Sequence, residues 1–225
     1  MQTHDYRATG ALLLERVTPV IEALFGAFAL NALPSDNGVA SIARIAKHCD
    51  PQWKHIYDYL VRLAARLDVP FRDDGMHSMT SILRTLAAHF QVRHDDEWRQ
   101  RIEHGVFEGP ANLDVLFFLA SRFNDGHNLL ALTLEASWHD EQQKLFQCGG
   151  AGFFISQELR LSGASTDILH FGANLRKALL RGNVEECALL VAFETADLLA
   201  GISDQGLRKQ VRLRVAEKLL SATSC

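Results

Sequence analysis

Residues 23–80 decide the predicted fold and read ALFGAFALNALPSDNGVASIARIAKHCDPQWKHIYDYLVRLAARLDVPFRDDGMHSMT. In three runs in and just before this stretch, apolar residues recur every three or four positions, as they do on one face of an α-helix. Thr18 and Asp50 each precede a proline, and a capping residue followed by a first-turn proline is a common helix start. The sequence therefore predicts three helices, over residues 19–31, 39–48 and 51–67.

Two short apolar runs follow the third predicted helix. Val69-Pro70-Phe71 and Met76-His77-Ser78-Met79 flank Asp73-Asp74-Gly75, whose glycine supplies the positive φ that a hairpin needs. Because Pro70 has no amide hydrogen, its strand is expected at a sheet edge. Three helices and a hairpin form a winged-helix pattern, which we expect to occupy a first domain, residues 1–90.

The same stretch resembles the N-terminal winged-helix dimerisation domain of small-molecule O-methyltransferases. The segments that carry this resemblance, which covers roughly residues 10–90, are Leu30–Leu33, Ile42–Ala46, Ile56–Leu67 and Gly75–Thr80. It implies a homodimer, for which Phe25, Phe28 and the run Leu12-Leu13-Leu14 are candidate interface residues.

The resemblance ends where the cofactor-binding domain of that family would begin. That domain holds S-adenosylmethionine with an acidic-Gly-x-Gly-x-Gly loop after a strand, and no such loop occurs here. The glycine cluster Cys148–Gly152 lies between segments with helical patterns, so we interpret it as a helix break. The sequence therefore predicts no S-adenosylmethionine domain and no cofactor.

Composition indicates an ordinary globular protein. The chain has 225 residues, of which 48% are hydrophobic and 22% charged, and its net charge is −4. This charge argues against a polyanion-binding surface spread over the whole molecule. No apolar run approaches the roughly 20 residues of a membrane span. Four scattered cysteines without a secretory leader favour reduced thiols in the cytoplasm.

The second half, residues 91–225, contains no convincing strand pattern. Helical spacing of apolar residues predicts helices over 113–123, 130–145, 153–161, 168–181 and 184–198, with a final helix after Ser203-Asp204. The predicted fold class is therefore mainly α: a winged-helix-like domain, with three helices and a short β-hairpin, followed by an all-α helical domain over 91–225.

Aromatic and polar side chains of this second half suggest a pocket for a small apolar ligand. The candidate lining residues are His127, Glu135, Trp138, His139, Phe153 and Phe154. On a helix, Glu135 and His139 would share a face as metal ligands do. The Glu-x-x-His pairs of a di-metal helical bundle are absent, so we expect a solvated face and no metal site.

The third predicted helix would be the recognition helix of a DNA-binding winged helix. Its candidate base-contacting residues are Gln52, Lys54, His55 and Arg62. Asp58 lies among them, and phosphate contacts normally require a more basic helix. The alternative is a helix used for packing or dimerisation.

The final helix is basic and amphipathic, a pattern that can meet an acidic partner or a membrane surface or simply complement the helix dipole. Its cations are Arg208, Lys209, Arg212, Arg214 and Lys218. No motif identifies a catalytic residue. We therefore expect a dimeric one-component regulator that responds to a small molecule. The alternatives are a biosynthetic enzyme with a methyltransferase-like N-terminal domain and a helical substrate pocket, not using S-adenosylmethionine, and an accessory protein that docks through its acidic second half and basic final helix.

Overall fold

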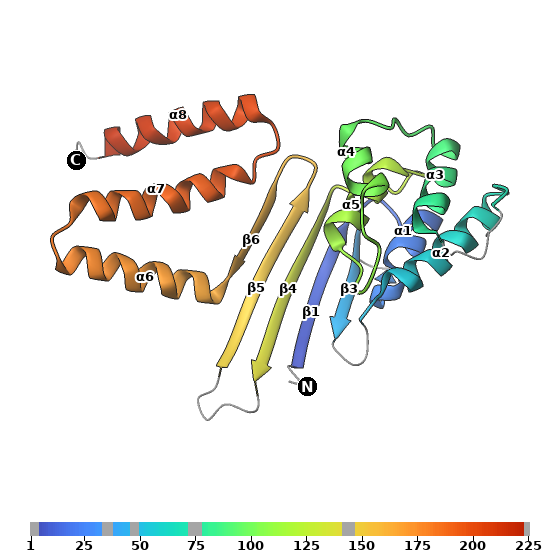
Figure 1. Ribbon diagram of the computed structural model, residues 1–225, viewed down its shortest axis with the longest axis horizontal. Helices are drawn as coiled ribbons and strands as arrows, with labels where there is room; N and C mark the ends of the chain where they lie inside the picture. The colour runs from blue at the N-terminus through green and yellow to red at the C-terminus, as the bar shows by residue number, and fades with distance from the viewer. Residues whose placement is uncertain (1–4, 33–37, 46–49, 72–77, 141–146, 223–225) are drawn as a thin grey trace.

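The computed structural model describes residues 5–32, 38–45, 50–71, 78–140 and 147–222. The strands in these ranges form one antiparallel sheet in the order β2-β3-β1-β4-β5-β6 (Figure 1). Their bounds are β1 (Asp5–Leu13), β2 (Asn31–Ala32), β3 (Val39–Ile45), β4 (Ala131–Asp140), β5 (Gln147–Ser156) and β6 (Arg160–Ala164). Because β1 pairs with both β3 and β4, strands from before and after residue 90 belong to the same sheet.

Alternating polarity along β4 determines which face of the sheet is buried. Leu132, Leu134 and Ala136 are buried, whereas Thr133 and Glu135 between them are exposed. Successive side chains of a strand point to opposite faces, so the apolar residues of β4 share one face. Leu12 of β1, which pairs with Leu132, is fully buried on the same face.

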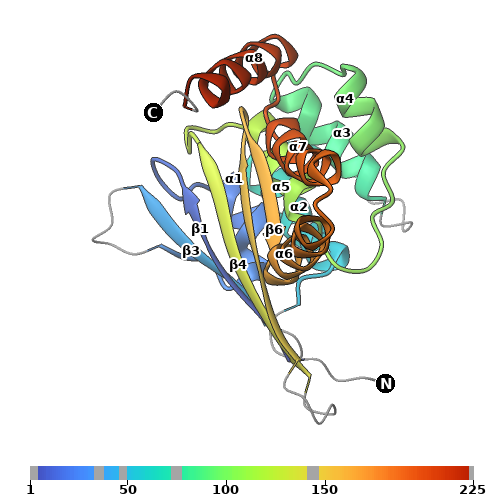
Figure 2. The ribbon, with the colours of Figure 1, turned by 90° about the vertical axis from the view of Figure 1, so that its left-hand side faces the viewer.

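Helices cover this apolar face, and in the described part of the chain the opposite face carries no helix (Figure 2). The covering elements are α1 (Pro19–Phe25), η1 (Gly26–Phe28), α2 (Trp53–Arg66), α3 (Met79–His89), α4 (Asp96–Trp98), η2 (Arg99–Glu103) and α5 (Leu113–Arg122). Phe25, Trp98 and Phe117 fill the space between these helices and the sheet. We call the sheet with these helices the body.

Three further helices extend beyond β6, away from the body (Figure 1). They are α6 (Ser165–Leu180), α7 (Val184–Ala200) and α8 (Gln205–Ala222), and we call them the C-terminal arm. The main hydrophobic core runs from Ala8 to Ile155 and includes no residue of the arm.

The predicted winged helix followed by an all-α domain is wrong, because a sheet lies at the centre of the fold. The helix predicted over 39–48 is instead strand β3, each of whose residues pairs with β1. Ala40 and Ile42 are buried two positions apart, as in a strand. Apolar spacing in such a short run fits either structure, and pairing with β1 decides between them.

The predicted wing is not a hairpin in the residues that flank its turn. Asp73-Asp74-Gly75 lies outside the described residues, but Val69–Phe71 is irregular and Met79 begins α3. Asp68 adopts a φ of 54°, and the backbone N–H of Val69 donates to the carbonyl of Ala64 at 2.9 Å. This left-handed residue turns the chain away at the end of α2.

The helices predicted over 130–145 and 153–161 are also wrong, since these segments contain β4 and β5. Gly149 pairs with Trp138, and a Cβ on Gly149 would lie 2.3 Å from the indole ring. The glycine cluster is therefore part of a strand that accommodates a neighbouring aromatic ring, not a helix break. The helices predicted around α2, α5 and the arm are confirmed.

Candidate functional site

The C-terminal arm consists of three helices that its sequence starts and stops locally. Asp167 accepts a hydrogen bond from the backbone N–H of Ala164 at 2.8 Å, Asn183 from that of Glu186 at 3.1 Å, and Asp204 from that of Leu207 at 2.7 Å. Gly182 has a φ of 64° in the turn between α6 and α7. These caps define where each arm helix begins and ends, and each stabilises its helix by about 1 kcal/mol.

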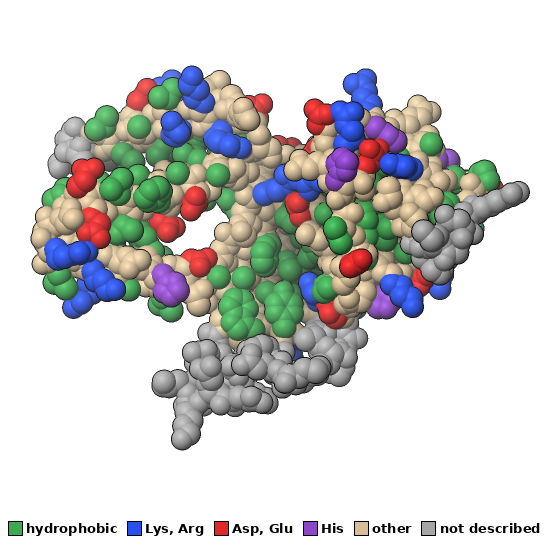
Figure 3. All heavy atoms as spheres, in the orientation of Figure 1, with side chains coloured by type: hydrophobic (Ala, Val, Ile, Leu, Met, Phe, Trp, Pro, Cys, Tyr) green, Lys and Arg blue, Asp and Glu red, His purple; other side chains and the backbone are tan. Residues whose placement is uncertain are grey.

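The arm exposes most of its large apolar side chains. Of its residues 165–221, whose burial the structure describes, only Ala178 and Leu199 are buried. Its exposed large apolar residues are Ile168, Leu169, Leu179, Leu180, Val184, Leu189, Val191, Phe193, Leu198, Leu207, Leu213, Leu219 and Leu220. Figure 3 shows apolar side chains spread over the arm between the charged ones. Exposed apolar surfaces of this kind occur where proteins bind other proteins, membranes or ligands.

Backbone contacts fasten the turn between α7 and α8 to the turn between β5 and β6. The N–H of Arg160 donates to the carbonyl of Gly201 at 2.9 Å, and the N–H of Ser203 donates to that of Glu158 at 2.8 Å. A Cβ on Gly201 would lie 2.1 Å from the carbonyl oxygen of Arg160. This close approach requires glycine and fixes the position at which the arm leaves the body.

A network of ion pairs lies where the arm joins the body. Asp114 of α5 holds Arg160 of β6 at 2.9 Å and Arg101 of η2 at 2.5 Å, while Asp95 holds Arg122 at 2.8 Å. A hydrogen bond from the backbone N–H of Trp98 lowers the pKa of Asp95, and the ion pair with Arg122 adds to this effect. Each charge has an opposite partner, which is typical of a structural network.

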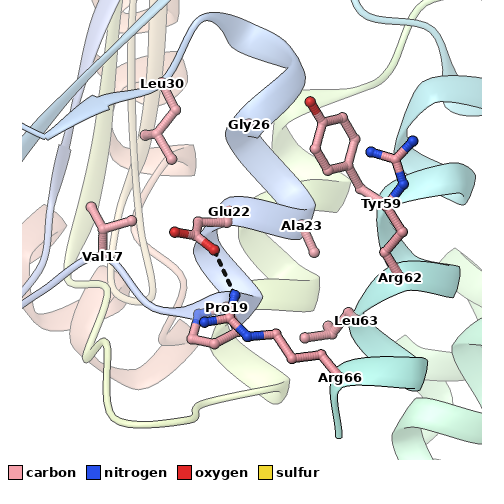
Figure 4. A pocket seen from close by; sticks show the side chains of 10 residues that line it. All are labelled: Val17, Pro19, Glu22, Ala23, Gly26, Leu30, Tyr59, Arg62, Leu63 and Arg66. Carbon is pink, nitrogen blue, oxygen red and sulfur yellow. Dashed lines mark hydrogen bonds and ion pairs between the residues drawn. The ribbon is translucent and has the colours of Figure 1, made fainter.

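A groove between α1 and α2 has a volume of about 470 Å³ (Figure 4). Its floor is apolar, and Arg62 stacks on Tyr59 with 5.5 Å between the guanidinium carbon and the ring centroid. Arg66 forms an exposed ion pair of 2.9 Å with Glu22 across the groove. Exposed pairs of this kind hold little free energy and indicate no particular ligand.

The residues predicted to line a ligand pocket do not converge. On β4, Glu135 lies on the bare face of the sheet and Trp138 on the helix-bearing face. His139 also lies in β4, but its side chain is outside the described part. Phe153 and Phe154 are consecutive residues of β5 and point to opposite faces. Phe153 lines an apolar groove of about 360 Å³ across β1, β4 and β5, which Tyr6 and Leu134 also line.

His127, the remaining predicted pocket residue, is buried between α5 and β4. Its Nδ1 accepts a hydrogen bond of 2.9 Å from the backbone N–H of Leu129. Burial lowers the pKa of His127, while the Asp125 carboxylate and the carbonyls of Ala120 and Phe123 oppose this. A neutral imidazole that fixes the loop before β4 is the arrangement that these contacts favour.

The four residues predicted to contact DNA do not form one surface. Gln52 and His55 contact each other at the start of α2, where the backbone N–H of Gln52 donates to Nδ1 of His55 at 3.2 Å. Lys54 and Arg62 line different grooves, Lys54 beside Trp53 and Arg62 beside Tyr59. Of the candidate dimer residues, Leu12, Leu14, Phe25 and Phe28 are buried in the core, whereas Leu13 is 44% exposed.

Two further features concern metals and membranes. Among the described residues, no three His, Cys, Asp or Glu side chains gather as metal ligands do. None of the described helices combines the length and the apolar character that crossing a membrane requires.

Comparison of the chain with protein-family models, with curated proteins and with solved structures gives no match.

The sequence pointed to the arm only through the basic final helix. Its exposed apolar side chains were missed, because an apolar stripe on a helix is normally expected to face a core.

Proposed function

We propose that this protein is an interaction protein whose C-terminal arm binds another protein chain. The observation that carries the proposal is the exposure of apolar side chains along all three arm helices. Leu180 is 71% exposed, Val184 79% and Leu220 76%, whereas most large apolar residues of the body are buried or partly buried. Removing apolar surface from water is favourable by about 25 cal/mol per Å², and this gain opposes the entropic cost of association.

The central helix of the arm supports the same function. Leu189 and Phe193, four positions apart, lie on one side of α7, and Val191 lies on the opposite side, yet all three are exposed. A helix with apolar residues on opposite sides is normally packed on both of them. Within the arm, α7 has neighbours on two sides, α6 and α8 (Figure 1). Its uncovered sides therefore suit a protein partner.

DNA binding and response to a small molecule stay predictions from the sequence. The described residues form no winged helix that could bind DNA. The groove between α1 and α2 is open to solvent and has an ion pair across it, and the groove across β1, β4 and β5 is lined mainly by apolar side chains. An accessory or interaction role is the function that this surface supports best.

Site-specific photo-crosslinking in cells that express the protein tests this function. A photoreactive amino acid in place of Phe193 is expected to form an adduct with another protein chain. The same amino acid at Thr133, on the bare face of the sheet, is the control and should form none. Adding Leu189→Gln and Leu198→Gln should abolish the adduct at position 193. Equal adduct formation at both positions, or none at position 193, would contradict the proposal.

A further inference from the structure

The accessible surface of the chain is larger than that of an average folded monomer of its mass. It measures 14784 Å² for 25.1 kDa, whereas a folded monomer of this mass exposes about 10,300 Å². The exposed apolar side chains of the arm contribute to this difference.

Two neighbouring helices of the arm carry opposite charges. Helix α7 has four carboxylates and no Lys or Arg, whereas α8 has five cations and one carboxylate. These residues are Glu185, Glu186, Glu194 and Asp197 on α7, and Arg208, Lys209, Arg212, Arg214, Glu217 and Lys218 on α8. The net charges are therefore −4 and +4. A surface with both signs is complementary to a second copy of itself.

The charges of α7 and α8 do not pair with each other in the described part of one chain. Of the ion pairs formed by described residues, none joins α7 to α8, and none includes Glu194 or Asp197. Glu186 pairs instead with Arg181 in the preceding turn, and Arg214 pairs with Glu217 on its own helix. The two carboxylates near the end of α7 are left to meet cations from elsewhere.

A groove between α7 and α8 provides a place for such a contact. Its volume is about 460 Å³, and it is lined by Ala196, Leu199, Ala200, Arg208, Lys209 and Arg212, together with Gln205. It thus offers small apolar side chains on one wall and three cations on the other. A helix with apolar residues and carboxylates fits this chemistry, and α7 itself has Glu194 and Asp197 beside Phe193 and Leu198.

We propose that the occupant is a second copy of this chain, with α7 of each copy lying in the groove between α7 and α8 of the other. The proposal rests on the interaction function proposed above and names its partner. In this arrangement a two-fold axis relates the arms, so the contact between one α7 and the partner's α8 occurs twice. Glu194 and Asp197 of each copy face the cations of the other.

Complementary charge reversal tests the pairing. One variant carries Glu194→Lys and Asp197→Lys, and the other carries Lys209→Glu and Arg212→Glu. Each variant alone places like charges at both contacts, and we expect its dimer dissociation constant to rise about tenfold or more. Mixed in equal amounts, the two variants place opposite charges at both contacts. The mixture should therefore regain a species of about 50 kDa in light scattering, twice the chain mass of 25.1 kDa.

Glu185→Lys is the matched control on α7. Glu185 lies nine positions before Glu194 and so on the opposite side of the helix. Its reversal should leave the dimer dissociation constant unchanged. Arg208 is not used in a variant, because its guanidinium donates to the carbonyl of Ile202 and supports the turn before α8. If the charge reversals do not weaken the dimer, or if mixing does not restore it, the pairing of α7 with α8 is contradicted.

If light scattering shows a monomeric wild-type chain at micromolar concentration, the second copy is not the partner. Amide hydrogen exchange of the arm then tests the proposed interaction function separately. Fast exchange along α6–α8, with binding of the apolar dye anilinonaphthalene sulfonate, would leave the arm free for a different protein. Slow exchange without dye binding would mean that the arm is covered by its own chain, and the interaction function would then also fail.

Discussion

The backbone N–H of Arg160 donates a hydrogen bond of 2.9 Å to the carbonyl of Gly201, which ties the turn between α7 and α8 to the start of β6. The same approach leaves no room for a Cβ on Gly201, which would lie 2.1 Å from the carbonyl oxygen of Arg160. A backbone oxygen cannot move aside as the end of a side chain can. The arm is therefore held at two points, here and where β6 continues into α6.

Gly201→Ala should detach the turn between α7 and α8 from the body. We expect faster amide exchange at Arg160 and Ser203, without a lower unfolding temperature of the body. Gly172→Ala is the control, because nothing lies within 4 Å of a Cβ at that position of α6. It should be neutral or stabilise α6 by up to about 1 kcal/mol. Unchanged exchange at Arg160 in the Gly201 variant would contradict this description of the junction.

Gly149→Val should destabilise the sheet. The new side chain would collide with the indole of Trp138, whose carbons lie 2.3 Å from the position of a Cβ, and the free energy of unfolding should fall by about 1–3 kcal/mol. Gly152→Val, in the same strand but with open space around its Cβ, should have little effect. Urea unfolding followed by tryptophan fluorescence measures both. Equal stability of the two variants would show that the ring does not require Gly149.

His127 should make the stability of the fold depend on pH. Its pKa is lowered in the folded protein, so below the unfolded value of about 6.5 the unfolded chain binds more protons than the folded one. The contribution of neutral His127 to the free energy of unfolding is therefore fully present above about pH 6.5. It is lost as the pH falls from there toward the folded-state pKa of His127. The loss is at most about 1.4 kcal/mol per pH unit.

His127→Gln should remove this dependence, whereas His89→Gln, a change at an exposed residue of α3, should preserve it. Urea midpoints between pH 7.5 and pH 5.5 provide the measurement. A His127 variant that keeps the full pH dependence of the wild type would assign the effect to other groups.

Phe193 and Phe117 should differ in their contribution to folding. Phe193 of the arm is 66% exposed, while Phe117 of α5 is 1% exposed in the core. At concentrations that dissociate any dimer, Phe193→Ala should change the free energy of unfolding by less than about 0.5 kcal/mol. Phe117→Ala should cost about 3–5 kcal/mol. If Phe193→Ala lowers the free energy of unfolding of the dissociated chain by as much as Phe117→Ala, the ring of Phe193 is packed in a core and the prediction is wrong.

The sequence predicts the helices of this protein better than its strands. Apolar residues at three- and four-residue spacing identify α2, α5 and the arm helices, because those segments are long and capped. In β4 the same residues fit two periods: Leu130, Leu134 and Trp138 are four apart, but residues 132–138 also alternate strictly between apolar and polar. The alternation correctly indicates a strand, and β4 forms that strand because it pairs with β1 and β5.

The glycine-rich strand β5 was harder to predict. Gly149 and Gly150 lower the strand propensity of the segment, and their reason lies on another strand, in the ring of Trp138. A sequence pattern within one segment contains no information about such a neighbour. The exposed faces of the arm were unpredictable for a related reason, since an apolar stripe does not reveal whether the surface that covers it belongs to the same chain.

Light scattering of the wild-type chain at micromolar concentration tests most directly the claim that the arm meets a second copy. A mass of about 50 kDa at low salt, decreasing toward 25.1 kDa as added salt screens the charges of α7 and α8, is the result that we predict. A mass of 25.1 kDa at every salt concentration would contradict it.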